Sequence, residues 1–316
     1  MNEKQISIYV KEYFEDCELR RRLSAKTIKA YKIDLKQYFC FIGTEIDNSK
    51  KIIEYILWLN QKYSKHKTVK RKLASVKAFY TYLEYEDVIG MTPFRKIRTQ
   101  VKEPKLLPKT ISSHHLNQIF GKLYEQMNHA KTLFQQHQTY RNIAVIELLF
   151  STGIRISELC HIKQEDIDIE EQTLKIFGKG SKERLLYIGN NDVVDVLKTY
   201  SEIRKKIFVN SQYFFVNKYG EKLSDQSVRL FLKKLEDELE MTMHITPHMF
   251  RHTFATSLLE KDVDIRYIQK ILGHSSISVT QIYTHVSYPK QKEILSAKNP
   301  MNDYHIYHSH LHKERL

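Results

Sequence analysis

The sequence predicts a mainly α-helical protein with a small antiparallel β-sheet, arranged as an all-helical N-terminal domain and an α+β C-terminal domain. Three observations support this prediction. Apolar residues recur at helical spacing through the first 90 residues. A basic stretch containing prolines then interrupts the pattern. Short alternating segments follow, and helical patterns return after them. The 316 residues are enough for two domains, each with its own core.

The N-terminal domain is expected to span residues 1–98, with helices through its first 90 residues. Ser24 is a plausible N-cap for a helix whose apolar residues lie on one face as far as Ile42. Residues 51–63 and 66–85 have the composition and spacing of two more helices. On the last of these, a basic stripe lies outside the apolar face and is suited to follow a phosphate backbone. The basic stripe consists of Lys67, Lys70, Arg71 and Lys77.

Charge is distributed unevenly along the chain, whose formal net charge is +14. Residues 1–110 hold 24 Lys and Arg against 13 Asp and Glu, whereas the remaining residues hold 27 against 24. A basic first domain favours nucleic acid as its partner, and a solvated basic surface is the alternative. Residues 99–110 are rich in proline and lysine and are expected to form an extended basic linker.

The C-terminal domain, residues 111–316, is expected to be mixed. A helix around 137–151 precedes three short strands at 166–170, 173–177 and 184–188. The Gly-containing segment "GKGSKE" joins the last two strands as a hairpin loop. After Asn190 the pattern is helical again, with an extended interruption at "YFFVN".

Composition also indicates where the protein works. No apolar run approaches the roughly 20 residues of a membrane-spanning helix, and the N-terminus lacks the apolar region of a signal peptide. Three scattered cysteines without metal-ligand spacing are typical of a reducing compartment. We therefore expect a cytoplasmic protein with no membrane partner.

The segment "PHMFRHTFAT" (247–256) places two imidazoles and a guanidinium at the start of a helix. Thr246 is a suitable N-cap and Pro247 a suitable first helical residue. His248, Arg251 and His252 then share one face, next to the unpaired N–H groups of the helix N-terminus, which favours a phosphate or carboxylate. His248 and His252 are also four residues apart, as zinc ligands can be, so a metallohydrolase is an alternative. The glutamate of the HExxH pattern is missing, and Arg251 would repel a cation.

A second segment, "LGHSSISVTQIYTH" (272–285), follows at short range. A helix is expected to end near Leu272 at Gly273, which places His274 in the turn. Ser275 or Ser276 would cap the next helix, which carries Tyr283.

Together these segments resemble the tyrosine recombinase (phage integrase) family. The resemblance includes "STGIRISEL" upstream and covers nearly the whole chain, because "LSAKTIKAYKIDLKQYFCFI" is similar to the family's N-terminal SAM-like core-binding domain. It implies that the C-terminal domain is the catalytic domain. Six positions match the family's catalytic residues in order and context: Arg155, Lys179, His248, Arg251, His274 and Tyr283.

The resemblance implies a reaction and a role for each residue. Tyr283 attacks a DNA phosphate and forms a covalent 3′-phosphotyrosyl intermediate. Arg155 and Arg251 bind the non-bridging oxygens, because guanidinium groups donate two directed hydrogen bonds and stay charged. His274 donates a third hydrogen bond, His248 accepts the phenol proton, and Lys179 protonates the leaving 5′-oxygen. No metal, nucleotide or other cofactor is required, and His252 would only support its neighbours.

The family also implies partners. We expect double-stranded DNA with inverted-repeat recombination sites, a homotetramer in the synaptic complex and a monomer otherwise, in the cytoplasm of a bacterium or of the host of a mobile element. Helical composition at 290–298, with the apolar pair Ile294 and Leu295, predicts a C-terminal tail that docks on a partner subunit. Two alternatives remain open, a type IB topoisomerase-like enzyme and a catalytically inactive DNA-binding regulator.

Overall fold

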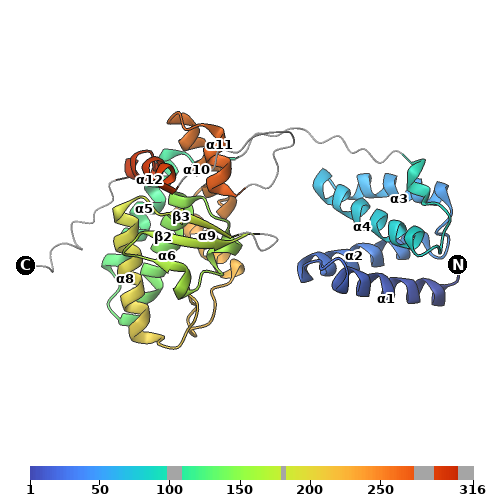
Figure 1. Ribbon diagram of the computed structural model, residues 1–316, viewed down its shortest axis with the longest axis horizontal. Coiled ribbons are helices and arrows are strands. Elements are labelled where there is room, and N and C mark those ends of the chain that lie inside the picture. The colour runs from blue at the N-terminus through green and yellow to red at the C-terminus, as the bar shows by residue number, and fades with distance from the viewer. Residues whose placement is uncertain (98–108, 179–182, 274–287, 305–316) are drawn as a thin grey trace, which may run out of the picture. The chain divides into compact units, whose positions relative to one another are not determined.

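The chain divides into two compact units, Met1–Leu106 and Leu107–Leu316, in a computed structural model that describes residues 1–97, 109–178, 183–273 and 288–304 (Figure 1). Each unit has its own hydrophobic core. The described residues include no helix that is both long and apolar enough to cross a bilayer. The chain is mainly α-helical with one small antiparallel sheet, which confirms the predicted fold class.

The described residues of the first unit form four α-helices: α1 (Glu3–Leu19), α2 (Ala25–Ile42), α3 (Ser49–Lys62) and α4 (His66–Tyr85). The Ser24 side chain accepts a hydrogen bond from Thr27 N, so it caps α2 as expected. Buried tyrosines dominate the core, and their hydroxyls need partners. Tyr38 and Tyr80 share a hydrogen bond of 2.7 Å, and Tyr80 also donates to the carbonyl of Ile46. These bonds connect α2 and α4 to the turn between α2 and α3.

A short helix follows α4 where the sequence suggested that helical structure stops. The 3₁₀-helix η1 (Pro93–Arg95) buries Phe94, whose ring lies 5.3 Å from that of Tyr80. The first unit therefore continues past α4, because an aromatic side chain there finds a place in the helical core.

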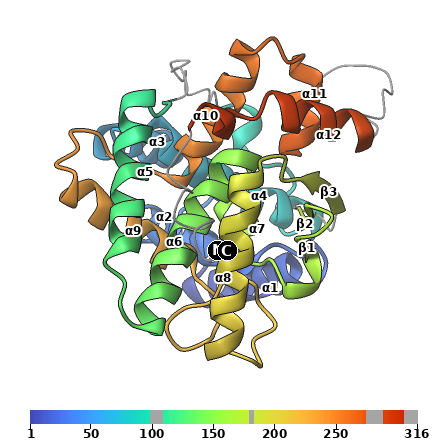
Figure 2. The ribbon, with the colours of Figure 1, turned by 90° about the vertical axis from the view of Figure 1, so that its left-hand side faces the viewer.

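The second unit is built around α6 (Leu133–Thr152), which contacts α5 (Ser113–Asn128), α8 (Asn191–Ile207) and α10 (Pro247–Glu260). The other helices described in this unit are α7 (Ile156–Leu159), η2 (Gln164–Asp166), α9 (Asp225–Glu238), α11 (Ile265–Leu272), α12 (Tyr288–Ala297) and η3 (Pro300–Asp303). Figures 1 and 2 both show α10, α11 and α12 at the same end of this unit.

The sheet consists of β1 (Ile167–Asp168), β2 (Thr173–Phe177) and β3 (Glu183–Tyr187), in that order and antiparallel. Strand β1 is shorter than the predicted 166–170, because η2 takes Asp166 and a turn with Gln172 at φ 53° follows. The pairing of Ile176 with Arg184 and of Leu174 with Leu186 fixes the register of β2 and β3. The expected extended segment at 213–217 makes isolated bridges at Tyr213 and Val216.

The C-terminal helix packs on the chain's own core. Ile294 and Leu295 of α12 are buried, and the Leu295 carbonyl lies so close to Gly189 that a Cβ there would sit 2.4 Å from it. Asn299 is fully buried and donates to the carbonyls of Ser151 and Ile188. The expectation that Ile294 and Leu295 dock on a partner is therefore wrong, because their own domain supplies the apolar surface. Residues 305–316 lie outside the described residues.

Candidate active site

Helix α10 begins at Pro247, as predicted, and Thr246 is the extended residue before it. The Thr246 side chain makes no capping hydrogen bond, which differs from the expectation. His248 and His252 are exposed, whereas Arg251 is 5% exposed. The predicted shared face therefore has its two imidazoles at the surface and its guanidinium directed into the domain.

Arg251 connects two helix ends. It donates from Nη1 to the carbonyl of Gly153 at 2.6 Å and from Nη2 to the carbonyl of Leu272 at 2.7 Å. Gly153 is the left-handed cap of α6, and Leu272 is the last residue of α11. Both carbonyls carry the partial negative charge of a helix C-terminus, which suits a buried cation. Burial and the nearby charge of Arg155 lower the pKa of Arg251 to about 10, so it remains charged at neutral pH.

Arg155 precedes α7 and is held by a carboxylate three residues later. Its backbone N–H donates to Glu158 Oε2 at 2.9 Å, and its Nη1 donates to Glu158 Oε1 at 2.8 Å. About a third of the Arg155 side chain is exposed (34%), whereas that of Glu158 is 4% exposed. Arg155 is therefore oriented from the protein side while part of it faces solvent.

Glu158 is a member of the site that the predictions omitted. Burial raises the pKa of its carboxyl, but hydrogen bonds from Arg184 and Arg155 outweigh it, so the pKa of Glu158 is lowered. Half of a known signal was present in the sequence, because a glutamate three positions after the residue that precedes a helix is the N3 residue of a capping box, although Arg155 replaces the usual Ser or Thr.

Arg184 of β3 is a second omitted member. It forms a bidentate pair with Glu158, with distances of 3.1 Å from Nη1 to Oε1 and 2.8 Å from Nη2 to Oε2. Its position opposite Ile176 places it on the sheet face of buried Leu174 and Leu186. A charged residue at the buried phase of an alternating strand is the pattern that would have revealed it.

His248 lies within the field of these cations. Desolvation, then the charges of His252, Arg229, Arg251 and Arg155, lower the pKa of His248 below its ordinary value. Desolvation and Arg251 also lower the pKa of His252. Both imidazoles are therefore neutral at neutral pH, and a neutral imidazole can accept a proton.

The structure brings together three of the six predicted catalytic residues. Arg155, which directly precedes α7, lies near His248 and Arg251 of α10. The other three, Lys179, His274 and Tyr283, lie outside the described residues. Gly273 is the left-handed cap of α11, as predicted, and directly precedes His274.

The predicted basic stripe is on α4. Lys67 and Lys70 are exposed, and the Lys77 ammonium lies 5.7 Å from the centre of the Phe94 ring. Arg71 is 42% exposed but forms an ion pair with fully buried Asp34. Arg71 thus has a structural partner that the spacing alone did not reveal.

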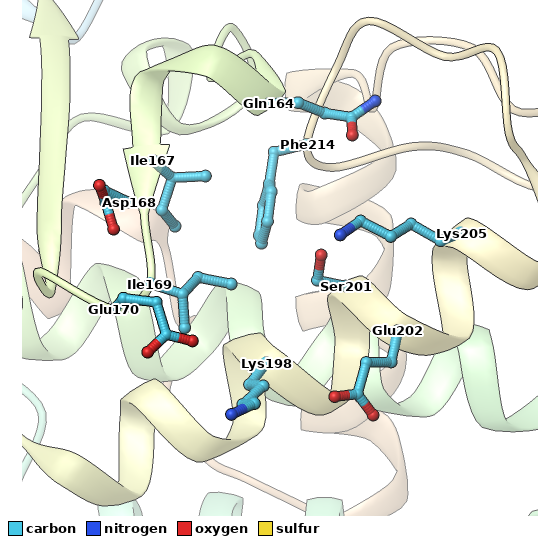
Figure 3. A pocket seen from close by; sticks show the side chains of 10 residues that line it. All are labelled: Gln164, Ile167, Asp168, Ile169, Glu170, Lys198, Ser201, Glu202, Lys205 and Phe214. Carbon is cyan, nitrogen blue, oxygen red and sulfur yellow. The ribbon is translucent and has the colours of Figure 1, made fainter.

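The second unit also has a cavity away from the predicted catalytic residues that the structure describes. A cavity of about 330 Å³ opens between β1 and α8, lined by Ile169, Phe214 and charged side chains of both signs, among them Glu202 and Lys205 (Figure 3). None of the six predicted catalytic residues lines it. Within the described ranges, no group of three or more His, Cys, Asp or Glu side chains is arranged to hold a metal ion.

Comparison with known proteins identifies the family of this chain. Residues 10–87 match the phage integrase N-terminal SAM-like domain, and residues 118–290 match the phage integrase family. A tyrosine recombinase of Agathobacter rectalis is 48% identical over 95% of this chain and 99% of its own length. The chain belongs to the phage integrase family. As a member of that family it is a tyrosine recombinase, and the predicted family and enzyme class are confirmed.

The family likeness extends to Xer proteins. Tyrosine recombinase XerC of Thermodesulfovibrio yellowstonii is 35% identical over 93% of this chain and 97% of its own length. Among solved structures, XerH bound to a palindromic difH substrate has a TM-score of 0.65 at 21% identity, covering 90% of this chain and 83% of XerH. A lambda integrase tetramer on a Holliday junction has a TM-score of 0.64 at 17% identity, covering 86% and 75%. These two structures share the fold of this integrase family member.

Proposed function

We propose that this chain is a site-specific recombinase that cuts and rejoins DNA strands with Tyr283 as nucleophile, without metal or ATP. One observation carries the proposal. Arg155 and Arg251, almost a hundred residues apart, lie close enough for the charge of one to lower the pKa of the other, and His248 lies beside them. Two like charges held together favour an anion between them, and a DNA phosphate is that anion in this family.

The proposed cleavage step exchanges one phosphate ester bond for another. The Tyr283 phenol oxygen bonds to phosphorus while the bond from phosphorus to the 5′-oxygen breaks. The phenol proton passes to neutral His248, and Lys179 supplies a proton to the leaving oxygen. Arg155, Arg251 and His274 donate hydrogen bonds to the non-bridging oxygens as charge develops on them. The products are a 3′-phosphotyrosyl enzyme and a free 5′-hydroxyl, and attack by another 5′-hydroxyl reverses the step.

The proposed partner is double-stranded DNA with inverted-repeat sites. The first unit would grip the duplex through the basic stripe on α4, and residues 99–110 would link the units. The similar lambda integrase was solved as a tetramer on a Holliday junction, and similar XerH was solved on its difH substrate. We propose that four subunits assemble here also, that the protein is a monomer without DNA, and that it acts in the cytoplasm of a bacterium or of a mobile element's host.

Tyr283→Phe tests the nucleophile. Incubation with a nicked candidate site, followed by denaturing electrophoresis, should give an SDS-resistant protein–DNA band with the unaltered chain and none with Tyr283→Phe, because only the phenol oxygen can form the ester. DNA binding by Tyr283→Phe in native gels should be unchanged.

Tyr288→Phe is the matched control, because it removes the same hydroxyl five positions later and should leave the band intact. Loss of the band with Tyr288→Phe instead would assign the nucleophile to Tyr288. Binding without a covalent band in the unaltered chain would support an inactive regulator, and relaxation of plasmids without paired sites would support a topoisomerase.

A further inference from the structure

Arg184 occupies an unusual place for a charged side chain. It lies on β3 at a position that pairs with Ile176, among side chains of the sheet's buried face, and its side chain is 15% exposed. Taking a guanidinium out of water is unfavourable unless its donors are satisfied. Its Nε is buried and has no hydrogen-bond partner among the residues that the structure describes, so its recorded polar contacts are made by the two terminal nitrogens.

Both terminal nitrogens bond to Glu158, one to each carboxylate oxygen. This fork-to-fork geometry fixes the carboxylate plane as well as its position. Glu158 uses the same two oxygens to accept from Arg155, one from its guanidinium and one from its backbone. Arg184 therefore fixes the carboxylate that orients Arg155.

The same guanidinium packs against the end of α11. A Cβ built on Gly273 would lie 2.9 Å from Arg184 Nη1 and 3.1 Å from its Cζ, so the guanidinium rests on the Gly273 backbone. Gly273 follows Leu272, whose carbonyl accepts from Arg251. Arg184 thus contacts Glu158, which binds Arg155. It also contacts Gly273, which follows Leu272, the residue that binds Arg251.

We infer that Arg184 is a positioning residue for strand cleavage, which sets the separation of Arg155 and Arg251 by holding Glu158 against the C-terminal end of α11. This inference rests on the proposed function, because the two arginines it positions are the proposed phosphate ligands. Arg184 itself touches Glu158 and Gly273, and its effect on the phosphate passes through them.

Arg184→Lys and Arg184→Ala test the inference by single-turnover cleavage of a nicked site, with DNA affinity measured separately. Both should slow cleavage by about 10- to 100-fold, the range for residues that orient a catalytic ligand, while the dissociation constant changes less than about threefold. Lysine should fail as well, because an ammonium lacks the planar fork that makes two parallel hydrogen bonds to a carboxylate. Guanidinium chloride at millimolar concentration should restore part of the rate of Arg184→Ala.

A double-mutant cycle with Glu158→Gln gives the readout that a purely structural role would not produce. If Arg184 acts through Glu158, Arg184→Ala should slow the Glu158→Gln protein far less than it slows the unaltered chain. Arg266→Ala is the control, because it removes an exposed arginine that pairs with Asp264 in the same domain and should leave cleavage unchanged.

Cleavage by Arg184→Lys at the unaltered rate would overturn the inference, as would independent effects in the cycle. If Arg184→Ala does not fold, Arg184→Lys decides, because it keeps the charge. These results are distinguishable from failure of the proposed function, which would appear as absence of the Tyr283 adduct in the unaltered chain.

Discussion

At the scale of single residues, His137 shows how burial sets the pH dependence of folding. It is fully buried on α6, and neither ring nitrogen has a hydrogen-bond partner within the described part of the chain. Its ring lies 5.1 Å from that of Phe208 and 5.6 Å from that of Tyr200. Burial, then the charges of Arg141 and Arg204, lower the pKa of His137 to about 4. As pH falls below the ordinary histidine value, the unfolded chain binds a proton that the folded chain does not bind until about pH 4. Stability is therefore lost across that window.

His137→Phe should remove this loss, because phenylalanine suits the aromatic surroundings and does not titrate. The shift from 6.5 to about 4 corresponds to roughly 3 kcal/mol. Urea unfolding between pH 4 and 7 should show a shallower decline in the free energy of unfolding for His137→Phe. His129→Phe, which removes an exposed imidazole, should keep the original decline. Equal declines in all three proteins would show that His137 is not the group responsible.

The residue scale also shows where sequence reasoning was limited. The roles of Arg155, His248 and Arg251 came from the family resemblance, and their spacing alone suggested only an anion site. Glu158 and Arg184 were not predicted as site residues. What marks them is the contact between their side chains, which lie 26 positions apart in the sequence, one on α7 and one on β3. Arg71 was placed in the basic stripe without its ion pair to Asp34, since the two residues are 37 positions apart.

At the scale of elements, periodicity predicted α2, α3, α4 and α6 and the strands β2 and β3 within a few residues, because both signals are local. The surface against which α12 packs cannot be predicted from local sequence. Its apolar pair was expected to dock on a partner, whereas the surface that buries it lies around Gly189, about a hundred residues earlier in the chain. A sequence shows that a helix has an apolar face but does not show which surface covers that face.

Leu295→Ala should therefore destabilise the second unit by about 2–5 kcal/mol, the usual cost of a cavity left by a buried leucine. Leu259→Ala, at a 45% exposed position, should have little effect.

Truncation after Tyr304 should leave the thermal midpoint unchanged, whereas truncation before Tyr288 should lower it, as followed by circular dichroism. A stable protein lacking α12 would show that the helix is dispensable for the core.

At the scale of the whole molecule, the two cores share no residue, and most of the excess of basic over acidic residues belongs to the first unit. Replacing Lys67, Lys70 and Lys77 together by glutamine should make the slope of log K against log salt shallower by about 2–3, if each lysine meets one phosphate. Glutamine at Lys4, Lys11 and Lys50 removes the same charge from other surfaces and should change the slope less. An equal change in both triple variants would place the contact elsewhere. Arg71 is left unchanged, because its loss would leave buried Asp34 with fewer partners.

The return of α12 to its own domain has a consequence for which subunit supplies the nucleophile. Tyr283 is about five residues from the first residue of α12, and an extended chain advances at most about 3.6 Å per residue. Tyr283 is thus tethered within roughly 18 Å of the start of a helix whose Ile294 and Leu295 side chains are buried in the same polypeptide. Donation of Tyr283 to a distant subunit would require α12 to leave its core. With Tyr283 as the proposed nucleophile and Arg155 and Arg251 as the proposed phosphate ligands, this tether favours cleavage in cis, by the subunit whose own arginines bind the strand.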